Sequence, residues 1–242
     1  IVQTHADLIA RRGGRPVEIV AVSATSRSKD RGADISGFAW EDDPVQLARR
    51  EDVDVVVELI GGENGVAKAL VETALKNGKD VVTANKALLA RHGTALARLA
   101  EANGRVLRFE AAVAGGIPVI KALTEGLAGN QIKRVMGVMN GTCNYILTRM
   151  ESAGLPYDTV FEEARKLGYL EADPNLDVGG IDAGHKLSLL SAIAFGTEVD
   201  FDAVVLQGIG SISIHDIRLA RDMGYSIKLL GVAQMTGRGL EQ

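Results

Sequence analysis

Short apolar runs alternate with helical segments through the first half of the chain. We expect strands at 17–23, 53–62, 79–85 and 105–113, and helices at 44–51, 63–78 and 86–104, the last broken near Gly93. The apolar runs are continuous and rich in valine, which is typical of parallel strands covered on both faces by helices. The pattern therefore predicts an α/β domain with a doubly wound parallel sheet at 1–114.

The rhythm changes after Gly115 and Gly116. From there we expect helices at 118–129, 142–153, 157–167, about 182–195 and 216–224, and strands at 132–141, 211–214 and 226–233. This order predicts a second, α+β domain at 115–242 with mixed or antiparallel strand pairing.

The first domain lacks one expected motif. A dinucleotide-binding fold carries G-x-G-x-x-G between its first strand and first helix, and this chain has no such loop. The chain opens without methionine on a segment that reads as a helix and is stopped by Gly13 and Gly14. We therefore expect a fragment whose first strand and glycine loop precede Ile1. The alternative is a flavodoxin-like sheet that binds another ligand.

Composition narrows the class of protein. The formal net charge is −4 and no basic cluster exceeds two residues, which argues against nucleic acid as a partner. The single cysteine, Cys143, excludes an internal disulfide and is typical of a reducing compartment. The apolar runs are too short to cross a membrane, and no signal peptide opens the chain. We expect a soluble, cytoplasmic protein with no membrane partner.

The loop after the strand at 17–23 carries candidate cofactor chemistry. The first acidic residue after this strand is Asp30, and it is preceded by Ser23, Arg27 and Lys29. NAD-preferring domains instead place an acidic residue at the end of the strand. A hydroxyl and two cations suit a 2′-phosphate, which favours NADP over NAD. An ordinary polar loop explains the same residues equally well.

Two further loops are expected at the same edge of the sheet. Gly61 and Gly62 bring backbone close to whatever lies above the strands. Lys86 stands at the start of a helix, where a cation opposes the helix dipole unless an anion or carboxylate accompanies it. Lys86 is therefore a functional candidate.

In the second domain, NGTCNY (140–145) follows a strand and opens a helix. Its backbone N–H groups and the Thr142 hydroxyl can therefore face a ligand. Cys143 invites interpretation as a nucleophile, but no histidine lies nearby in sequence. We interpret it as a small core residue.

The stretch GYLEADPNLDVGGIDAGHK (168–186) is rich in acids and glycines. Asp182 and Lys186 are four residues apart on a predicted helix and share a face, so an ordinary ion pair with Asp182 as the helix cap is one interpretation. The acids do not have the spacing of a calcium loop. Three glycines at the helix start favour a ligand or another backbone nearby: Gly179, Gly180 and Gly184. A desolvated lysine among carboxylates can also serve in proton transfer.

Taken together, six stretches resemble homoserine dehydrogenase: ELIGG, TANKALLA, EAAVAGGIPVI, NGTCNYIL, GYLEADPNLDVGGIDAGHKL and GYSIKLLG. The resemblance covers essentially the whole chain, and the acidic stretch is its most specific part. It implies NAD(P)-dependent interconversion of L-homoserine and L-aspartate 4-semialdehyde, in the route to threonine, methionine and isoleucine. It also implies a Rossmann-like domain, here without its first strand, followed by a substrate and dimerisation domain of a homodimer.

The resemblance also implies roles for individual residues. Lys186 matches the proton donor and acceptor at the substrate hydroxyl, Lys86 lies between cofactor and substrate, and Glu171 holds the amino acid. The other implied substrate contacts are Asp177, Asp182, Gly141 and Thr142, and the implied cofactor contacts are Ile60, Gly61 and Gly168. Asp173 is assigned no role.

The family further implies a monovalent-cation site. Glu110 and the carbonyls of Val113, Gly115 and Ile117 would give hard oxygen ligands to sodium. Two other functions remain open on the sequence: a nucleotide-binding regulatory protein without catalysis, and a dehydrogenase of another small amino or hydroxy acid. A thiol would be needed to oxidise an aldehyde to the acid level, so the interpretation of Cys143 as core favours the alcohol/aldehyde couple.

Overall fold

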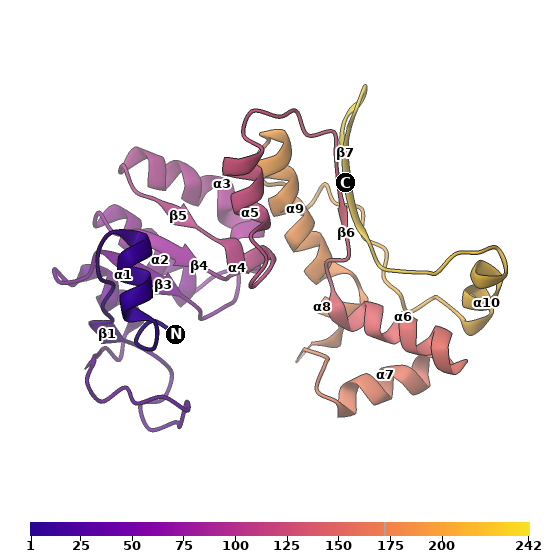
Figure 1. Ribbon diagram of the computed structural model, residues 1–242, viewed down its shortest axis with the longest axis horizontal. Coiled ribbons are helices and arrows are strands. Elements are labelled where there is room, and N and C mark those ends of the chain that lie inside the picture. The colour runs from indigo at the N-terminus through magenta and orange to yellow at the C-terminus, as the bar shows by residue number, and fades with distance from the viewer. Residues whose placement is uncertain (172) are drawn as a thin grey trace. The chain divides into compact units, whose positions relative to one another are not determined.

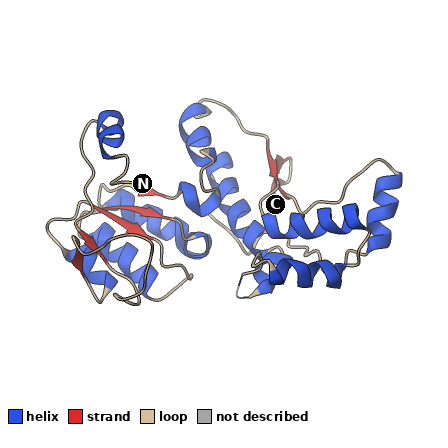
Figure 2. Ribbon diagram, turned by 60° about the horizontal axis from the view of Figure 1, so that its bottom comes forward, coloured by secondary structure: helices blue, strands red, loops and turns tan. Residues whose placement is uncertain are grey.

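The computed structural model describes residues 1–171 and 173–242. The chain forms two compact units, each built from helices and strands (Figures 1 and 2). The first comprises Ile1–Leu88 and Ala95–Phe109, and the second comprises Leu89–Thr94 and Glu110–Gln242.

Parallel strands form the sheets of the first unit. A three-stranded sheet has the order β3 (Val55–Glu58), β4 (Asp80–Thr83) and β5 (Leu107–Arg108), and a separate pair joins β1 (Ala21–Val22) to β2 (Ala39–Trp40). Every pairing in these sheets is parallel, with Val56 opposite Val81 and Ala21 opposite Ala39. The predicted α/β class with a parallel sheet is confirmed.

The helices of the first unit are α1 (Ala6–Gly13), the 3₁₀ helix η1 (Pro44–Arg49), α2 (Val66–Lys76) and α3 (Lys86–Ala102), whose residues 89–94 belong to the second unit. Helix α2 packs against η1, β3 and β4. Its residues Leu70, Val71, Ala74 and Leu75 are at most 2% exposed, so this helix supplies much of the core beneath the sheet.

Only one face of strand β3 is buried. Val56 and Glu58 are buried, whereas Val55 and Val57 are 45% and 57% exposed, and Val82 on β4 is 39% exposed. The predicted α/β class holds, and the described residues leave this face of β3 and β4 partly uncovered. A valine-rich run leaves the burial of alternate side chains undetermined, because the pleat sends them to opposite faces.

Three other expectations for residues 1–114 are corrected. Helix α3 runs unbroken through Gly93, where a Cβ would lie 3.3 Å from Val199 Cγ2, so this glycine permits a close approach and does not break the helix. The segment at 44–51 forms a 3₁₀ helix begun by a proline, and the short strand β2 was not expected. The strand expected at 105–113 is shortened to β5, and residues 110–113 form helix α4 (Glu110–Val113).

The second unit adds an antiparallel sheet and most of the remaining helices. The sheet has the order β6 (Arg134–Gly137), β7 (Gly231–Thr236) and β8 (Gly239–Glu241). The helices after α4 are α5 (Val119–Lys121), the π-helical turn η2 (Ala122–Gly126), α6 (Gly141–Ala153), α7 (Tyr157–Lys166), α8 (Pro174–Val178), α9 (Ile181–Phe195) and α10 (Ile214–Asp222). The antiparallel pairing confirms the predicted change of architecture.

Helices α6 and α7 lie side by side and form the main core of this unit (Figure 1). That core contains Cys143, Ile146 and Met150 of α6, and Val160 and Ala164 of α7, all fully buried. This packing fixes the start of helix α6, at residues 140–143, next to the acidic stretch.

Two strand predictions in this unit are wrong. Residues 211–213 form no strand, because Ser213 begins α10 with a capping box: its Oγ accepts from the Asp216 N–H and the Asp216 carboxylate accepts from the Ser213 N–H. The strand expected at 226–233 begins only at Gly231. Across the described ranges, every helix is too short or too polar to span a bilayer.

Candidate functional site

Asn140 joins two buried aspartates at the start of helix α6. Its Oδ1 accepts from the Cys143 N–H (2.8 Å) and caps the helix. Its Nδ2 donates to Asp177 Oδ1 (2.9 Å) and to Asp182 Oδ2 (3.1 Å). Asp177 and Asp182 are each 3% exposed, so the structure brings these two predicted residues together in the interior.

Lys186 is held between a carboxylate and a carbonyl. Its Nζ donates to Asp182 Oδ2 (2.7 Å) and to the Met139 carbonyl (2.8 Å). The lysine side chain is 21% exposed and the aspartate side chain 4%. The predicted ion pair is therefore confirmed, and the lysine remains within reach of a small molecule. Asp182 does not cap the helix, since Gly180 occupies the N-cap position.

The segment 168–171 is fixed to this network by two hydrogen bonds. Asp177 Oδ2 accepts from the Glu171 N–H (3.0 Å), and the Thr142 hydroxyl donates to the Tyr169 carbonyl (2.8 Å). The Thr142 hydroxyl was expected to face a ligand. Its proton is used in the bond to the Tyr169 carbonyl, and its oxygen can still accept a hydrogen bond. Gly168 has φ 72° in the turn after α7, and Glu171 is exposed.

The glycines of the acidic stretch are explained by packing inside the protein. The Ile209 N–H donates to the Val178 carbonyl (2.9 Å), so residues 207–209 run against residues 178–180. A Cβ on Gly208 would lie 2.5 Å from the Val178 carbonyl oxygen, and a Cβ on Gly184 would lie 2.6 Å from Leu206 Cδ2. Within the acidic stretch, a Cβ on Gly180 would lie 3.6 Å from the Gln207 carbonyl oxygen, so the prediction of another backbone nearby is confirmed there. Gly184 lies against side chains, and a ligand near these glycines stays a prediction. Asp173, to which no role was given, caps α8 by accepting from the Asn175 N–H.

Cys143 is a core residue. It is fully buried, and its Sγ donates to the Asp177 carbonyl (3.1 Å). Burial, followed by the negative charges of Asp177 and Asp182, raises the pKa of the thiol to about 12. A thiol held neutral is a poor nucleophile, so the interpretation made from the sequence agrees with the site.

Asn140 is not among the site residues predicted from the sequence. The signal available was the order strand, Asn-Gly, helix, which marks an N-cap. That pattern indicates the bond to Cys143 and carries no information on Asp177 or Asp182, which lie 37 and 42 residues further along.

In the first unit, Glu58 shapes the loop that was expected to contact the cofactor. Glu58 is fully buried at the end of β3, and its Oε1 accepts from the N–H groups of Ile60 (2.7 Å) and Gly61 (3.1 Å). Its Oε2 accepts from the Thr83 hydroxyl at the end of β4. These N–H groups therefore point into the protein, and Gly61 and Gly62 turn with φ 89° and 83°.

Asn85 ties the same loop to helix α3. Its Oδ1 accepts from the Leu88 N–H (3.0 Å) as the helix cap, and its Nδ2 donates to the Gly62 carbonyl (2.8 Å). Lys86 follows as the first residue of α3 and is partly buried. Ile60, Gly61 and Lys86 thus lie at the carboxyl edge of the parallel sheet, where such sheets bind ligands.

Ser23 and Arg27 follow strand β1 in a region with an open hydrogen-bonding position. The Ser23 Oγ is buried and has no hydrogen-bond partner among the described residues. The Arg27 guanidinium lies 5.9 Å from the centre of the Trp40 ring. A hollow of about 320 Å³, which Ser23 does not line, is bordered by Arg27, Ala33, Asp34, Ile35, Ser36, Phe38 and Trp40. A partnerless buried hydroxyl and an exposed cation fit the sugar and phosphate of a nucleotide.

The predicted sodium ligands lie around the end of α4. Both Glu110 carboxylate oxygens already accept backbone N–H groups, from Ile120 (2.7 Å) and Lys121 (3.0 Å). The Ile117 carbonyl accepts from the Val119 N–H (2.8 Å). Gly115 lies in the turn between α4 and Ile117. Wherever the structure describes the chain, no group of three or more His, Cys, Asp or Glu residues is placed to hold a metal ion. The predicted sodium site consists mainly of backbone carbonyls, including that of Val113, so it would not form such a group.

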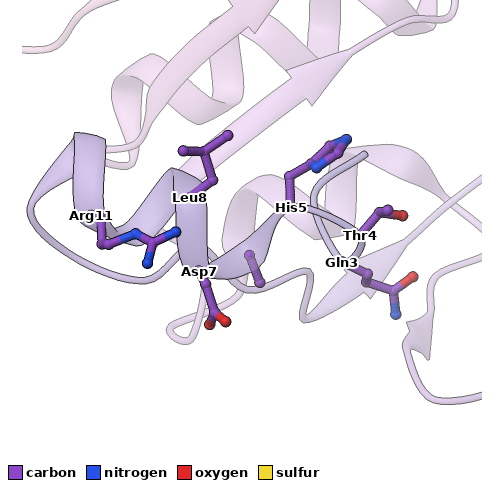
Figure 3. Close-up of a pocket in the computed structure, with 7 residues that line it drawn as sticks. Gln3, Thr4, His5, Asp7, Leu8 and Arg11 are labelled. Atoms are coloured by element: carbon purple, nitrogen blue, oxygen red, sulfur yellow. The ribbon is translucent and has the colours of Figure 1, made fainter.

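A second hollow lies on helix α1 and the turn before it. Figure 3 shows its lining, with Gln3, Thr4 and His5 from the turn and Asp7, Leu8 and Arg11 from the helix, around a volume of about 320 Å³. None of the predicted site residues lines it.

The predicted site residues form two groups, one in each unit. Ser23, Arg27, Ile60, Gly61 and Lys86 lie in the first, and the substrate candidates, Gly168 and the sodium candidates lie in the second.

Comparison with known proteins assigns both units to one family. Residues 1–110 match the model described as "Homoserine dehydrogenase, NAD binding domain", and residues 118–241 match the model described as "Homoserine dehydrogenase". The chain is 50% identical over 241 residues to the homoserine dehydrogenase of Neisseria gonorrhoeae and 46% identical to that of Pseudomonas aeruginosa. Each alignment covers 100% of this chain and 55% of the relative.

Solved structures agree with the sequence relatives. A homoserine dehydrogenase from Thiobacillus denitrificans superimposes with a TM-score of 0.94 at 44% identity, over 99% of this chain and 55% of that one. One from Staphylococcus aureus at pH 6.0 gives a TM-score of 0.84 at 34% identity, over 99% of this chain and 60% of that one. The chain thus spans about half the length of the curated relatives it matches. The chain belongs to the homoserine dehydrogenase family.

Proposed function

We propose that the protein containing this chain interconverts L-homoserine and L-aspartate 4-semialdehyde with a nicotinamide cofactor. The observation that carries the proposal is the hydrogen-bonded series Lys186, Asp182, Asn140 and Asp177, which ends at the Glu171 N–H. It presents a partly exposed ammonium and an exposed carboxylate on either side of two buried carboxylates. Membership of the family supports the same activity.

Lys186 is assigned the proton transfer. In the direction of homoserine oxidation its neutral amine takes the proton of the substrate hydroxyl, and in reduction its ammonium returns it. Asp182 and the Met139 carbonyl fix Nζ at 2.7 and 2.8 Å, so the amine is positioned before substrate arrives.

The carboxylates are assigned to the substrate ammonium. Glu171 is exposed at the rim, and its backbone is held by Asp177 Oδ2 (3.0 Å). Carboxylate oxygens accept strongly from an ammonium group, and a zwitterionic substrate needs both signs of charge in one site. The Gly141 and Thr142 segment, at the start of α6, offers backbone N–H groups to the substrate carboxylate.

The cofactor binds to the first unit in this proposal. A bound nicotinamide cofactor supplies hydride transfer, which no side chain can perform. Ser23 would hold the ribose through its partnerless hydroxyl, and Lys86 and the Ile60-Gly61 backbone would lie along the nicotinamide side. We propose NADP in preference to NAD, because Arg27 is an exposed cation held over Trp40 at the same loop.

The Arg27→Ala variant tests this preference. We expect the KM for NADP to rise about tenfold or more, because a charge-assisted bond to the 2′-phosphate is lost. The KM for NAD should change little, since NAD lacks that phosphate. Arg49→Ala is the matched control, an exposed arginine at the end of η1 in the same unit. Equal effects of Arg27→Ala on NADP and NAD would contradict the assignment.

A monovalent cation is proposed at the turn after α4, with the carbonyls of Val113, Gly115 and Ile117 as hard ligands. The Glu110 carboxylate accepts from the Ile120 and Lys121 N–H groups and so helps to fix this turn. Its oxygens can accept further bonds, because each carboxylate oxygen has two lone pairs. Titration of the purified protein with sodium against a large organic cation, followed by thermal stability, tests this. No sodium-specific rise in Tm would count against the site.

A homodimer and a cytoplasmic location complete the proposal. Strand β6 and its continuation expose two apolar side chains on one face of the sheet, Met136 and Val138, each 58% exposed. Such a patch on an antiparallel sheet supports a contact with a second copy, which sedimentation would detect. The cytoplasm is proposed from the single free thiol, Cys143.

The proposed activity is tested by an absorbance assay on the full-length protein. We expect reduction of NADP that depends on homoserine, and oxidation of NADPH that depends on aspartate semialdehyde. A regulatory nucleotide-binding protein would bind the cofactor without either reaction. A dehydrogenase of another acid would reject homoserine and accept a different substrate in the same assay. Either result would contradict the proposed function.

A further inference from the structure

We propose that Asn140 is a positioning residue of the reaction, acting on Lys186 through Asp182 and on Glu171 through Asp177. The inference rests on the proposed function above, because it gives Asn140 a part in that same site. It differs from a purely structural role as a helix cap, which is the role that the sequence indicates.

The Asn140 amide lies between two like charges. Asp177 Oδ1 and Asp182 Oδ2 both bond to the single atom Nδ2 of Asn140, at 2.9 and 3.1 Å, so these oxygens lie within about 6 Å of each other. Both carboxylates are 3% exposed and little water reaches them. Two like charges at that separation destabilise each other unless donors offset them, and the Asn140 amide gives one N–H to each.

Position 140 requires three hydrogen-bonding functions in one side chain. The residue at 140 donates to Asp177, donates to Asp182 and accepts from the Cys143 N–H. Serine offers one donor and aspartate at neutral pH offers none, so neither replaces the asparagine. The amide orientation is also determined, because the opposite one would direct its oxygen at two carboxylates and its NH₂ at a backbone N–H.

Asn140 is also connected to the groups that are assigned the chemistry. Lys186 Nζ bonds to the carbonyl of Met139 and to Asp182, so residues 139 and 140 hold the lysine both directly and through the aspartate. On the other side, Asp177 Oδ2 holds the Glu171 N–H. A shift of the Asn140 amide would therefore displace both ends of the site, which a cap alone would not do.

The charged and titratable groups around Asn140 come from three helices and one loop. They are Cys143 of α6, Asp177 of α8, Asp182 and Lys186 of α9, and Glu171, which approaches through its backbone. A carboxylate at position 140 would add a third negative charge beside the lysine. That change favours the charged ammonium, and the amine would lose its proton only at higher pH.

The test compares two variants of Asn140 with one of Asn144 in the full-length protein. Asn140→Ser keeps a good N-cap and loses the second donor, so helix α6 is retained while the bridge is broken. Asn140→Asp keeps the shape and changes the charge. Asn144→Ser is the matched control, since Asn144 lies one turn along α6 and bonds to the Leu229 backbone and the Asn140 carbonyl, away from both aspartates.

We expect Asn140→Ser to lower kcat/KM for homoserine about tenfold or more, since a buried bond to a charged group is lost. Cofactor affinity, measured by fluorescence titration, should be unchanged. For Asn140→Asp, the pH at which kcat rises in homoserine oxidation should move up by about one unit or more. Asn144→Ser should lower Tm and leave the pH profile in place.

The outcomes separate the two claims. If the wild type has no homoserine-dependent turnover, the proposed function fails, and this inference fails with it. If the wild type turns over homoserine while folded Asn140→Ser matches its kcat/KM and pH profile, only the positioning role is overturned. An equal shift of the profile in Asn144→Ser would overturn it as well. Should Asn140→Asp not fold, Asn140→Ser alone decides.

Discussion

At the start of helix α9, a partly exposed lysine is held against an aspartate that is almost completely buried. Removing one member of such a pair leaves an uncompensated charge in the interior, and that is far more costly than losing an exposed ion pair. The Asn140 N–H gives Asp182 a second donor, so the buried carboxylate does not depend on Lys186 alone.

The buried thiol of Cys143 makes the stability of the folded protein depend on pH in the alkaline range. Burial raises the pKa of this thiol from 9.0 to about 12 in the folded protein. Below pH 9 both states hold the proton, and its contribution to stability is fully present. Above pH 9 the unfolded state releases a proton that the folded state retains, so stability falls until about pH 12.

We therefore predict a steeper alkaline loss of stability in the wild type than in Cys143→Ala. The measurement is the free energy of unfolding in urea at several pH values between 9 and 12. Cys143→Ala should be less stable at neutral pH because of the cavity, but its alkaline slope should be shallower. Parallel slopes for the two proteins would show that the thiol is not responsible.

Residue spacing predicts contacts only where the chain is regular. Asp182 and Lys186 are one helical turn apart, so their pairing could be predicted, and the core role of Cys143 followed from its isolation. Asn140 could not be assigned beyond its cap, because its carboxylate partners come from distant segments. The roles of the substrate and cofactor residues stay predictions from the family.

At the scale of the element, the junction between α8 and α9 depends on a backbone contact. Residues 207–209 run against 178–180, joined by the bond from the Ile209 N–H to the Val178 carbonyl. Gly208 permits this approach, since a Cβ there would lie 2.5 Å from that carbonyl and 3.0 Å from Gly179 Cα. The junction in turn holds Asp177 and Asp182 at either side of it.

Gly208→Ala is expected to destabilise the protein by about 1–3 kcal/mol, because backbone atoms cannot move aside as a flexible side chain can. It should also reduce homoserine turnover, since the two aspartates are displaced. Gly210→Ala is the matched control two residues away, where a Cβ meets nothing within 4 Å and φ is not positive. Thermal unfolding of both variants tests this, and similar Tm values would contradict it.

Element predictions held where hydrophobic periodicity and capping residues agree. The long helices α2, α6 and α9 and the strands β3, β4 and β6 lie where the pattern placed them. The pattern failed where tertiary contact overrides local preference: Gly93 packs on Val199, and residues 110–113 turn into a helix whose first residue, Glu110, supports α5. It also failed at 211–213, where a capping box competes with a strand-like composition.

At the scale of the whole molecule, each unit holds one half of the proposed chemistry. The first has a buried Glu58 that orders the loop at Ile60 and Gly61, beside Lys86. The second has the series from Lys186 to Glu171. Helix α3 belongs to both, because it begins with Lys86 in the first unit and contributes residues 89–94 to the second.

The class of each unit could be predicted from the sequence, because continuous valine-rich runs and a change of rhythm after residue 115 carry that information. The exposure of one face of β3 could not, since burial depends on what packs there. Cofactor preference and assembly depend on partners outside the chain, and they stay proposals.

The most direct test of the central claim is the turnover of homoserine by Lys186→Ala in the full-length protein. Lys76→Ala is the matched control, since Lys76 follows Glu72 by the same four residues on an exposed helix face. We predict that Lys186→Ala lowers kcat by about 100-fold or more, the usual contribution of a general base, and binds the cofactor normally. Lys76→Ala should behave as the wild type. A folded Lys186→Ala protein with near-normal kcat would contradict the account.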